Sequence, residues 1–102
     1  MVFIGTTGKI NFLRVSEQGN IYGAPGDQLD TEVVVKLDSA PDLAFGFELR
    51  PSDQNLPSNL SMLSILRDAY IHQLTVGLAY DIESGKKQGH LCRVEYTTPP
   101  NP

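Results

Sequence analysis

The stretch SNLSMLSILRDAYIHQLTVGLAYDIESGKKQGHLCRVEY, residues 58–96, carries the clearest structural signal in the chain. Apolar residues recur at helical spacing in its first part and then alternate with small or polar residues, as in a half-buried strand. A polar segment with two glycines and two lysines follows, and a second alternating run closes the stretch. The stretch therefore predicts one amphipathic helix followed by an antiparallel hairpin.

The predicted helix has one wide apolar side. On a helical projection six apolar side chains fall on an arc of roughly 160°. These are Met62, Leu63, Ile65, Leu66, Ala69 and Tyr70. We predict Ser58 as the N-cap, with Asn55 as the alternative because Pro57 suits a first helical turn. Leu60 and Ile71 lie outside the arc and flank Arg67, either as ordinary apolar helix ends or as a contact surface for a loop or another subunit.

The two strands of the hairpin differ in pattern. In the run 74–82 the face opposite the apolar one is small in its middle, at Gly77 and Ala79, which lets a backbone or a ligand come close. In the run 90–96 strict alternation predicts one face with His90, Cys92, Val94 and Tyr96, and another with Leu91, Arg93 and Glu95. Residues 83–89 form the connecting loop.

Three further strands precede the helix. The run 9–15 alternates imperfectly, so either both of its faces are covered or a bulge switches them. The run 31–38 directs Thr31, Val33, Val35 and Leu37 to one face, and the run 44–50 directs Phe45, Phe47 and Leu49 to the core. The short connection at 39–43 predicts an antiparallel pair. Residues 16–30 form a turn and a loop rich in glycine and aspartate.

The element order is therefore β-β-β-α-β-β, a mostly β chain with one helix. This order resembles the OB-fold, a small five-stranded barrel, over residues 9–96. A β-grasp-like α+β fold is the alternative, and it would make the 9–15 segment peripheral. We expect one domain over 1–96 and a disordered, proline-rich tail over 97–102.

A closer resemblance lies in the run MLSILRDAYIHQLTVGLAYDI with GKKQG and HLCRVEY, which is similar to the second half of the pentameric B subunits of bacterial AB-type toxins. The resemblance implies a ring-like homo-oligomer and glycan binding. This chain departs from many such subunits because it has a single cysteine and no tryptophan to stack on a sugar.

Composition narrows the possible partners and location. The formal charge is −4 and the eight Lys and Arg are scattered, which disfavours duplex DNA and anionic membranes. The lone Cys92 allows no intrachain disulfide, and the N-terminus has neither a basic leader nor a membrane-spanning run. We therefore expect a soluble protein, with the cytoplasm as its favoured location. Asn59 begins a glycosylation sequon, which matters only in a secretory pathway.

No motif in the chain predicts catalysis or metal binding. Asp68 and His72 are neighbours on the helix, as an oriented base, half a metal site or a surface pair. A zinc site would also need His90 and Cys92, which share a predicted strand face. Cys92 with a histidine could be a nucleophile, but a lone strand cysteine is usually a small buried hydrophobe. We expect no enzymatic activity, no cofactor and no metal.

The expected function is that of a non-enzymatic oligomeric binding or assembly module, with a glycan or small polar molecule as ligand. The candidate ligand contacts are Asn20, Tyr22, Asp27 and Gln28 in the loop after the first strand, and Lys86 and Lys87 in the last hairpin. The candidate oligomer contacts are Leu60, Arg67, Ile71, Gly77 and Ala79. The alternative is a single-strand nucleic-acid-binding OB domain, which would need a basic groove and outward-facing Phe45 or Phe47.

Overall fold

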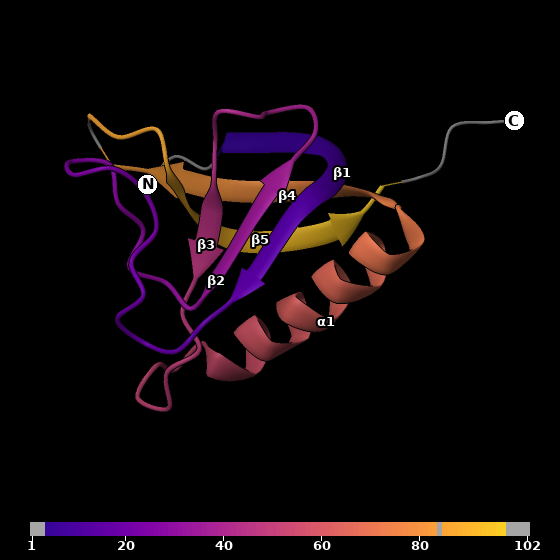
Figure 1. Ribbon diagram of the computed structural model, residues 1–102. Coiled ribbons are helices and arrows are strands. Elements are labelled where there is room, and N and C mark those ends of the chain that lie inside the picture. The colour runs from indigo at the N-terminus through magenta and orange to yellow at the C-terminus, as the bar shows by residue number, and fades with distance from the viewer. Residues whose placement is uncertain (1–3, 84, 98–102) are drawn as a thin grey trace, which may run out of the picture.

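Five strands and one helix follow one another in the order expected from the sequence. The computed structural model describes residues 4–83 and 85–97. The elements are β1 (Ile4–Val15), β2 (Val33–Leu37), β3 (Phe45–Phe47), α1 (Leu56–His72), β4 (Thr75–Ile82) and β5 (Gly89–Tyr96). Figure 1 shows the strands crossing one another at an angle, with α1 lying along one end of the sheet.

The sheet closes on itself in the order β1-β2-β3-β5-β4. The first half of β1 pairs with β4 and its second half with β2, and the register shifts between Ile10 and Phe12 where β1 bends (Figure 1). The predicted irregularity in 9–15 is therefore a bulge. Because β1 joins both neighbours, the β-grasp-like alternative, in which this segment is peripheral, is wrong.

The closing contact between β3 and β5 is the shortest in the sheet. These strands run parallel and share two residue pairs, Phe45 with Gly89 and Gly46 with His90. All the other neighbouring strands are antiparallel. Beyond Gly46 and His90, β3 and β5 are joined by side chains rather than by the ladder.

The core lies inside the ring of strands, as the alternation predicts. Val33, Val35, Phe45 and Phe47 are fully buried there, and burial of each such side chain stabilises the fold by about 1.5–3 kcal/mol. From α1, Met62, Leu66 and Ala69 face the same core. A second apolar cluster covers the outside of β2, because the 16–32 loop folds over Val34.

The N-cap lies three residues before the predicted one, and the helix begins at Leu56. Asn55 is the N-cap residue, as in the alternative, and Ser58 lies inside the first turn. Asn55 makes no side-chain cap; instead its amide donates to Oδ1 of Asp53 at 2.8 Å. The C-terminal end closes through Gln73, whose left-handed backbone (φ 53°) ends the helix before Leu74. Tyr70, expected on the core side, is 41% exposed.

The strict alternation predicted for the last strand is wrong. The register shifts opposite Ala79 and Tyr80, which pair with Arg93 and Leu91, so Cys92 is an extra residue in a bulge. The bulge changes the phase of the strand. As a result Leu91 and Val94 both face the core and are buried, although the pattern placed them on opposite faces.

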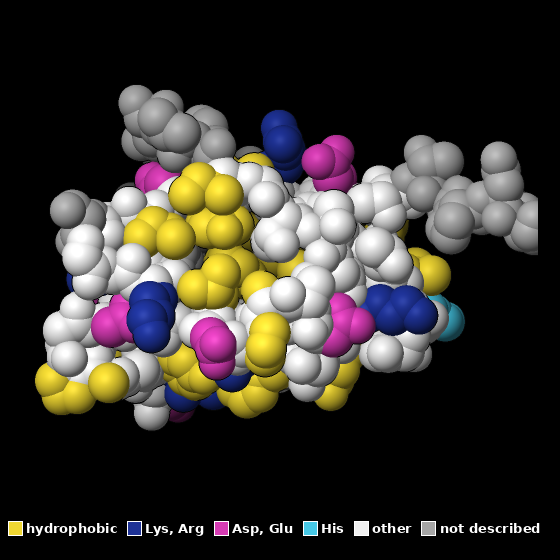
Figure 2. All heavy atoms as spheres, turned by 90° about the horizontal axis from the view of Figure 1, so that it is seen from above, with side chains coloured by type: hydrophobic (Ala, Val, Ile, Leu, Met, Phe, Trp, Pro, Cys, Tyr) yellow, Lys and Arg dark blue, Asp and Glu magenta, His cyan; other side chains and the backbone are white. Residues whose placement is uncertain are grey.

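Outside these elements, two observations bear on the whole chain. No helix among the described residues is long and apolar enough to cross a membrane. The predicted disordered tail falls mainly on residues 98–102, outside the described residues, and its first residue, Thr97, still lies 3.5 Å from the Thr75 carbonyl. Figure 2 shows charges of both signs interspersed with apolar side chains on one face.

Gly46 tests how tightly β2 and β3 pack. A Cβ at this position would lie 2.7 Å from the carbonyl oxygen of Val33 and would press on Thr31. We expect Gly46→Ala to lower the free energy of unfolding by about 1–3 kcal/mol, measured by urea denaturation. Gly5→Ala is the control, because the nearest atom to its Cβ is 3.8 Å away. If both variants lost the same free energy of unfolding, the close contact of Gly46 with Val33 and Thr31 would be contradicted.

Candidate functional site

The loop between β1 and β2 meets the β4–β5 hairpin at one end of the barrel (Figure 1). Oδ1 of Asp27 accepts the backbone amides of Lys87 at 2.9 Å and Gln88 at 3.1 Å. The Gln88 side chain in turn accepts the amide of Ala44 at 2.7 Å. Gly23 permits this close approach, because its φ is +107° and a Cβ there would meet the Asp27 backbone.

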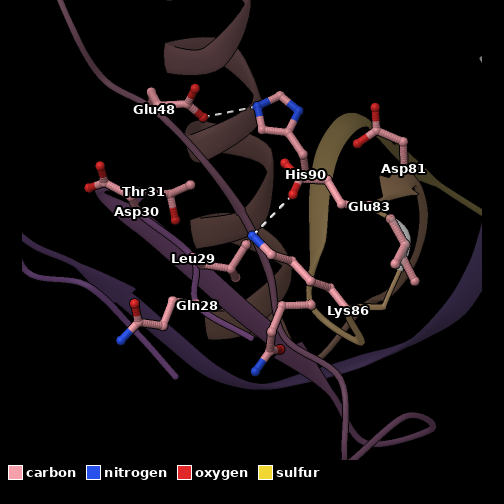
Figure 3. Close-up of a pocket in the computed structure, with 11 residues that line it drawn as sticks. Gln28, Leu29, Asp30, Thr31, Glu48, Asp81, Glu83, Lys86 and His90 are labelled. Carbon is pink, nitrogen blue, oxygen red and sulfur yellow. Dashed lines mark hydrogen bonds and ion pairs between the residues drawn. The ribbon is translucent and has the colours of Figure 1, made fainter. Parts of the chain in front are cut away.

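Beside this junction lies an open hollow of about 640 Å³, which we call the loop-side hollow (Figure 3). Its lining comes from the β1–β2 loop, the end of β3, and the β4–β5 hairpin. The charged members are Asp30, Glu48, Asp81, Glu83, Lys86 and His90, and the others are Gln28, Leu29, Thr31, Ile82 and Gln88. Segments far apart in the sequence therefore form one polar site.

The loop-side hollow has an excess of carboxylates. Nε2 of His90 lies 2.9 Å from Oε1 of Glu48, and Nζ of Lys86 lies 3.1 Å from Oε2 of Glu83. The Asp81 carboxylate makes no hydrogen bond or ion pair with residues 4–83 or 85–97. Four carboxylates thus line the hollow with one lysine and one histidine, and Arg50 behind it pairs with Asp30, so the arrangement suits hydroxyl or ammonium groups better than anions.

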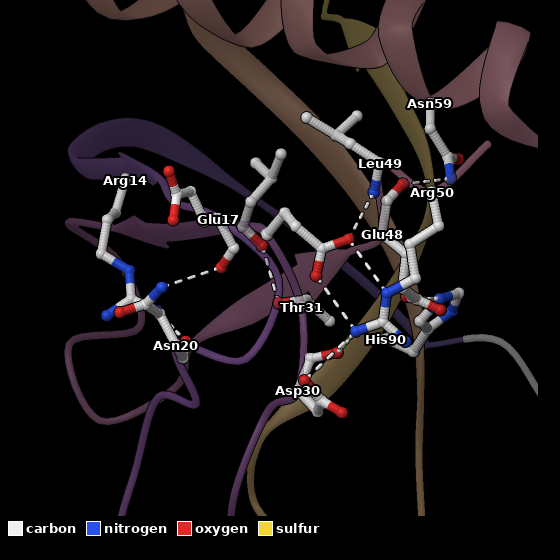
Figure 4. A network of polar contacts seen from close by, with 12 residues as sticks. Arg14, Glu17, Asn20, Asp30, Thr31, Glu48, Leu49, Arg50, Asn59 and His90 are labelled. Carbon is white, nitrogen blue, oxygen red and sulfur yellow. Dashed lines mark hydrogen bonds and ion pairs between the residues drawn. The ribbon is translucent and has the colours of Figure 1, made fainter.

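A buried carboxylate joins the segment before β2 to the segment after β3, whose residues Leu49 and Arg50 are labelled in Figure 4. The Glu32 residue is only 4% exposed, and its carboxylate accepts the Leu49 amide at 2.9 Å and two bonds from the Arg50 guanidinium at 3.0 and 3.1 Å. Arg50 also contacts the carbonyl and carboxylate of Asp30. The bond to Glu32 raises the pKa of Arg50, which therefore remains a cation.

A second polar contact fixes Glu48 against the helix. Nδ2 of Asn59 donates to the Glu48 carbonyl at 2.7 Å, and Asn59 is 6% exposed. Glu48 is consequently held by Asn59 at its backbone and by His90 at its carboxylate (Figure 4). The Asn59 side-chain amide is thus buried and hydrogen-bonded, so the glycosylation sequon is not accessible in the folded chain.

A smaller hollow of about 460 Å³, which we call the helix-side hollow, lies on the other side of Glu48 and His90. It is lined by Glu48, Asp53, Asn55, Ser58, Asn59, Met62, His90, Leu91 and Cys92. Cys92 and His90 thus do share a hollow. However, Sγ of Cys92 donates to the Ala79 carbonyl at 3.1 Å, and partial burial together with the charge of Asp81 raises the pKa of the thiol. A nucleophilic cysteine needs the opposite shift.

The histidine and aspartate of the helix do not form the expected pair. Oδ1 of Asp68 lies 4.0 Å from Nε of Arg67, and Asp68 makes no hydrogen bond or ion pair with His72. His72 is exposed at the end of α1, away from both hollows. Within the part of the chain that the structure describes, no three His, Cys, Asp or Glu side chains could hold a metal together.

The predicted ligand contacts separate into three groups. Gln28 and Lys86 line the loop-side hollow, whereas Asp27 and the Lys87 amide form the junction beside it. Asn20 and Tyr22 lie elsewhere. The Asn20 carbonyl accepts from Arg14 at 2.7 Å. The Tyr22 ring is 5.9 Å from that of Phe12 and lies 5.4 Å from the Arg14 guanidinium carbon, so it packs against two side chains of β1.

The predicted oligomer contacts also divide. Leu60 and Ile71 are 49% and 66% exposed, and the Arg67 side chain between them is exposed as well. Gly77 and Ala79 are buried within the sheet. The small-residue face is covered by the chain itself, because the Glu95 side chain lies over Gly77. Only the three helix residues therefore remain on a surface.

Several residues of the site were not expected from the sequence. Asp30, Glu48, Asp81, Glu83 and His90 lie beside predicted ligand contacts or on predicted outer strand faces. They come together because β3 and β5 run parallel. The order of elements alone does not reveal this pairing.

Comparison of the chain with protein-family models, with curated proteins and with solved structures yields no match.

The buried carboxylate provides a stability test. Glu32→Gln keeps the shape of the side chain but removes its charge, leaving the Arg50 guanidinium with Asp30 as its remaining carboxylate partner. We expect the free energy of unfolding to fall by about 1–3 kcal/mol in chemical denaturation. Glu17→Gln, at an exposed turn residue, is the matched control and should change it by less than about 0.5 kcal/mol. A stability equal to that of the native chain would show that the Glu32 contacts are dispensable.

Proposed function

We propose that this chain is a non-enzymatic, oligomeric binding module of the OB-like class, and that its ligand is a small polar molecule or glycan residue. The observation that carries the proposal is the loop-side hollow itself. The β1–β2 loop and the β4–β5 hairpin meet there, and both were expected to supply ligand contacts. In OB-like barrels these two loops flank the binding face.

The lining supports a ligand with hydroxyl or amino groups. Carboxylates accept hydrogen bonds and attract ammonium groups, whereas they repel phosphate and carboxylate groups. Asp81 and Asp30 stand in the hollow together with the lysine ion pair and the histidine hydrogen bond described above, so its polar side chains outnumber its apolar ones. The hollow lies within the size range of ordinary small-molecule sites, about 300–1,000 Å³.

The OB-like assignment is supported by the ring order β1-β2-β3-β5-β4 and by the position of α1 between β3 and β4. Homo-oligomerisation, including a ring, is supported by the exposed apolar residues of the helix. Leu60 and Ile71 lie on the side of α1 that faces away from the core. A cytoplasmic location remains part of the proposal, on the ground of the single cysteine.

Binding of single-stranded nucleic acid receives no support. Phe45 and Phe47, which would have to stack on bases, are fully buried. The hollow beside them carries four carboxylates, which repel phosphates.

Ligand binding can be tested by NMR titration of the labelled protein with glucose and with glucosamine. We expect millimolar binding, tighter for the amino sugar, with the largest amide shifts at residues 28–31, 81–83 and 86–90. Asp81→Asn should weaken glucosamine binding by about two- to fivefold, as expected for one partly exposed ion pair.

Asp68→Asn is the matched control, because it removes an exposed carboxylate of α1 outside both hollows. It should leave glucosamine affinity unchanged. If neither sugar moves the amides of the loop-side hollow, this site is not a binding site for small polar molecules.

Self-association can be tested by light scattering, which should give a mass several times that of one chain. Ile71→Asp places a charge on the most exposed large apolar residue and should shift the mass toward the monomer without unfolding the protein. Ser64→Asp, at an exposed polar position of the same helix, should leave the mass unchanged. A native chain that is monomeric at micromolar concentration would rule out the assembly.

A further inference from the structure

The two hollows share a wall made of two side chains. Glu48 and His90 line both the loop-side and the helix-side hollow, and no other residue lines both. Their contact is at the surface: the side chains are 26% and 49% exposed. A polar contact this exposed contributes at most about 1 kcal/mol, so separating its members costs little.

The backbone does not close the chain at this point. The ladder between β3 and β5 ends at Gly46 and His90, two residues before Glu48 on the β3 side. Beyond this pair the Glu48 carboxylate and the His90 ring form a hydrogen-bonded contact between the two segments, as Figure 3 shows. The two hollows therefore lie one on each side of this side-chain pair, and we call them together the groove.

Charge and shape together indicate what would fill such a groove. Its loop-side part has Asp81 without a partner among the described residues, and its helix-side part has Asp53. Apolar surface lies next to the carboxylates in both parts, from Leu29 and Ile82 in one and from Met62 and Leu91 in the other. Carboxylates alternating with apolar surface complement a flexible chain in which ammonium groups alternate with methylene segments.

We propose that the groove binds a linear aliphatic polyamine, with one ammonium group at Asp81, another at Asp53, and a methylene segment passing Glu48 and His90. This inference rests on the proposed function, since it specifies the ligand class of the same hollow and extends the site into the helix-side hollow. Exposed carboxylates elsewhere, such as Asp68, lack the adjoining groove.

The test is an NMR titration of the intact protein with spermine and, for comparison, with the short diamine putrescine. Spermine should shift amides in both hollows, at 81–83 and also at 53–59 and 91–92, whereas putrescine should shift only one set. Asp53→Asn keeps the oxygen that caps the Asn55 amide. It should weaken spermine binding by about two- to fivefold and leave glucosamine binding unchanged. Asp68→Asn should affect neither ligand.

Three results would overturn the inference. The first is that spermine shifts amides of the loop-side hollow alone. The second is that Asp53→Asn binds spermine as tightly as the native chain, and the third is that Asp53→Asn and Asp68→Asn lose spermine affinity equally. With the first two, glucosamine binding to the loop-side hollow would still support the proposed function. Loss of the glucosamine response in the native chain would count against the proposed function instead, so the two failures are distinguishable.

Discussion

The fold and the site both depend on the buried contact between Glu32 and Arg50. Burying a carboxylate is costly unless its oxygens are occupied, and here a forked guanidinium and a backbone amide occupy both oxygens of Glu32. The contact joins the start of β2 to the segment that follows β3. That segment carries Glu48 and then leads to α1, so the same contact fixes the edge of the loop-side hollow and the approach to the helix.

This arrangement compensates for the short pairing between β3 and β5, which closes the sheet. A five-stranded ring requires β3 and β5 to meet, yet they share only two residue pairs. Each pair contains one glycine, and these glycines let the two strands lie close to their antiparallel neighbours, since a Cβ at Gly89 would meet the Tyr80 ring of β4 and one at Gly46 would meet the Val33 carbonyl of β2. Polar side chains then extend the closure, with Asn59 holding the Glu48 backbone and His90 its carboxylate. The place where backbone pairing is weakest is thus also the place where ionisable side chains gather.

The parts of the fold that could be predicted from the sequence are those set by local periodicity. Val33, Val35, Phe45 and Phe47 alternate cleanly, and they are the buried core. Periodicity failed at Cys92, where a bulge changes the phase of β5, because nothing in the adjacent residues marks an inserted position. It also implied that Glu32 lies on the face opposite Val33 and Val35, but it could not show that Arg50 covers this carboxylate. The candidate site was predicted only in part. Gln28 and Lys86 lie on turn-rich segments that composition identifies, whereas Glu48 and His90 meet through a parallel pairing of residues 42 positions apart.

The division of β1 between two neighbours also affects how the chain can fold. Its second half pairs with β2, but its first half pairs with β4, so Ile4 finds its partner only at Tyr80. Contacts so distant in sequence require a long loop to close, and such topologies fold more slowly than helical bundles. On the ribosome the second half of β1 can pair early with β2. Its first half must wait, with its hydrogen-bonding groups unpaired, until β4 has been made.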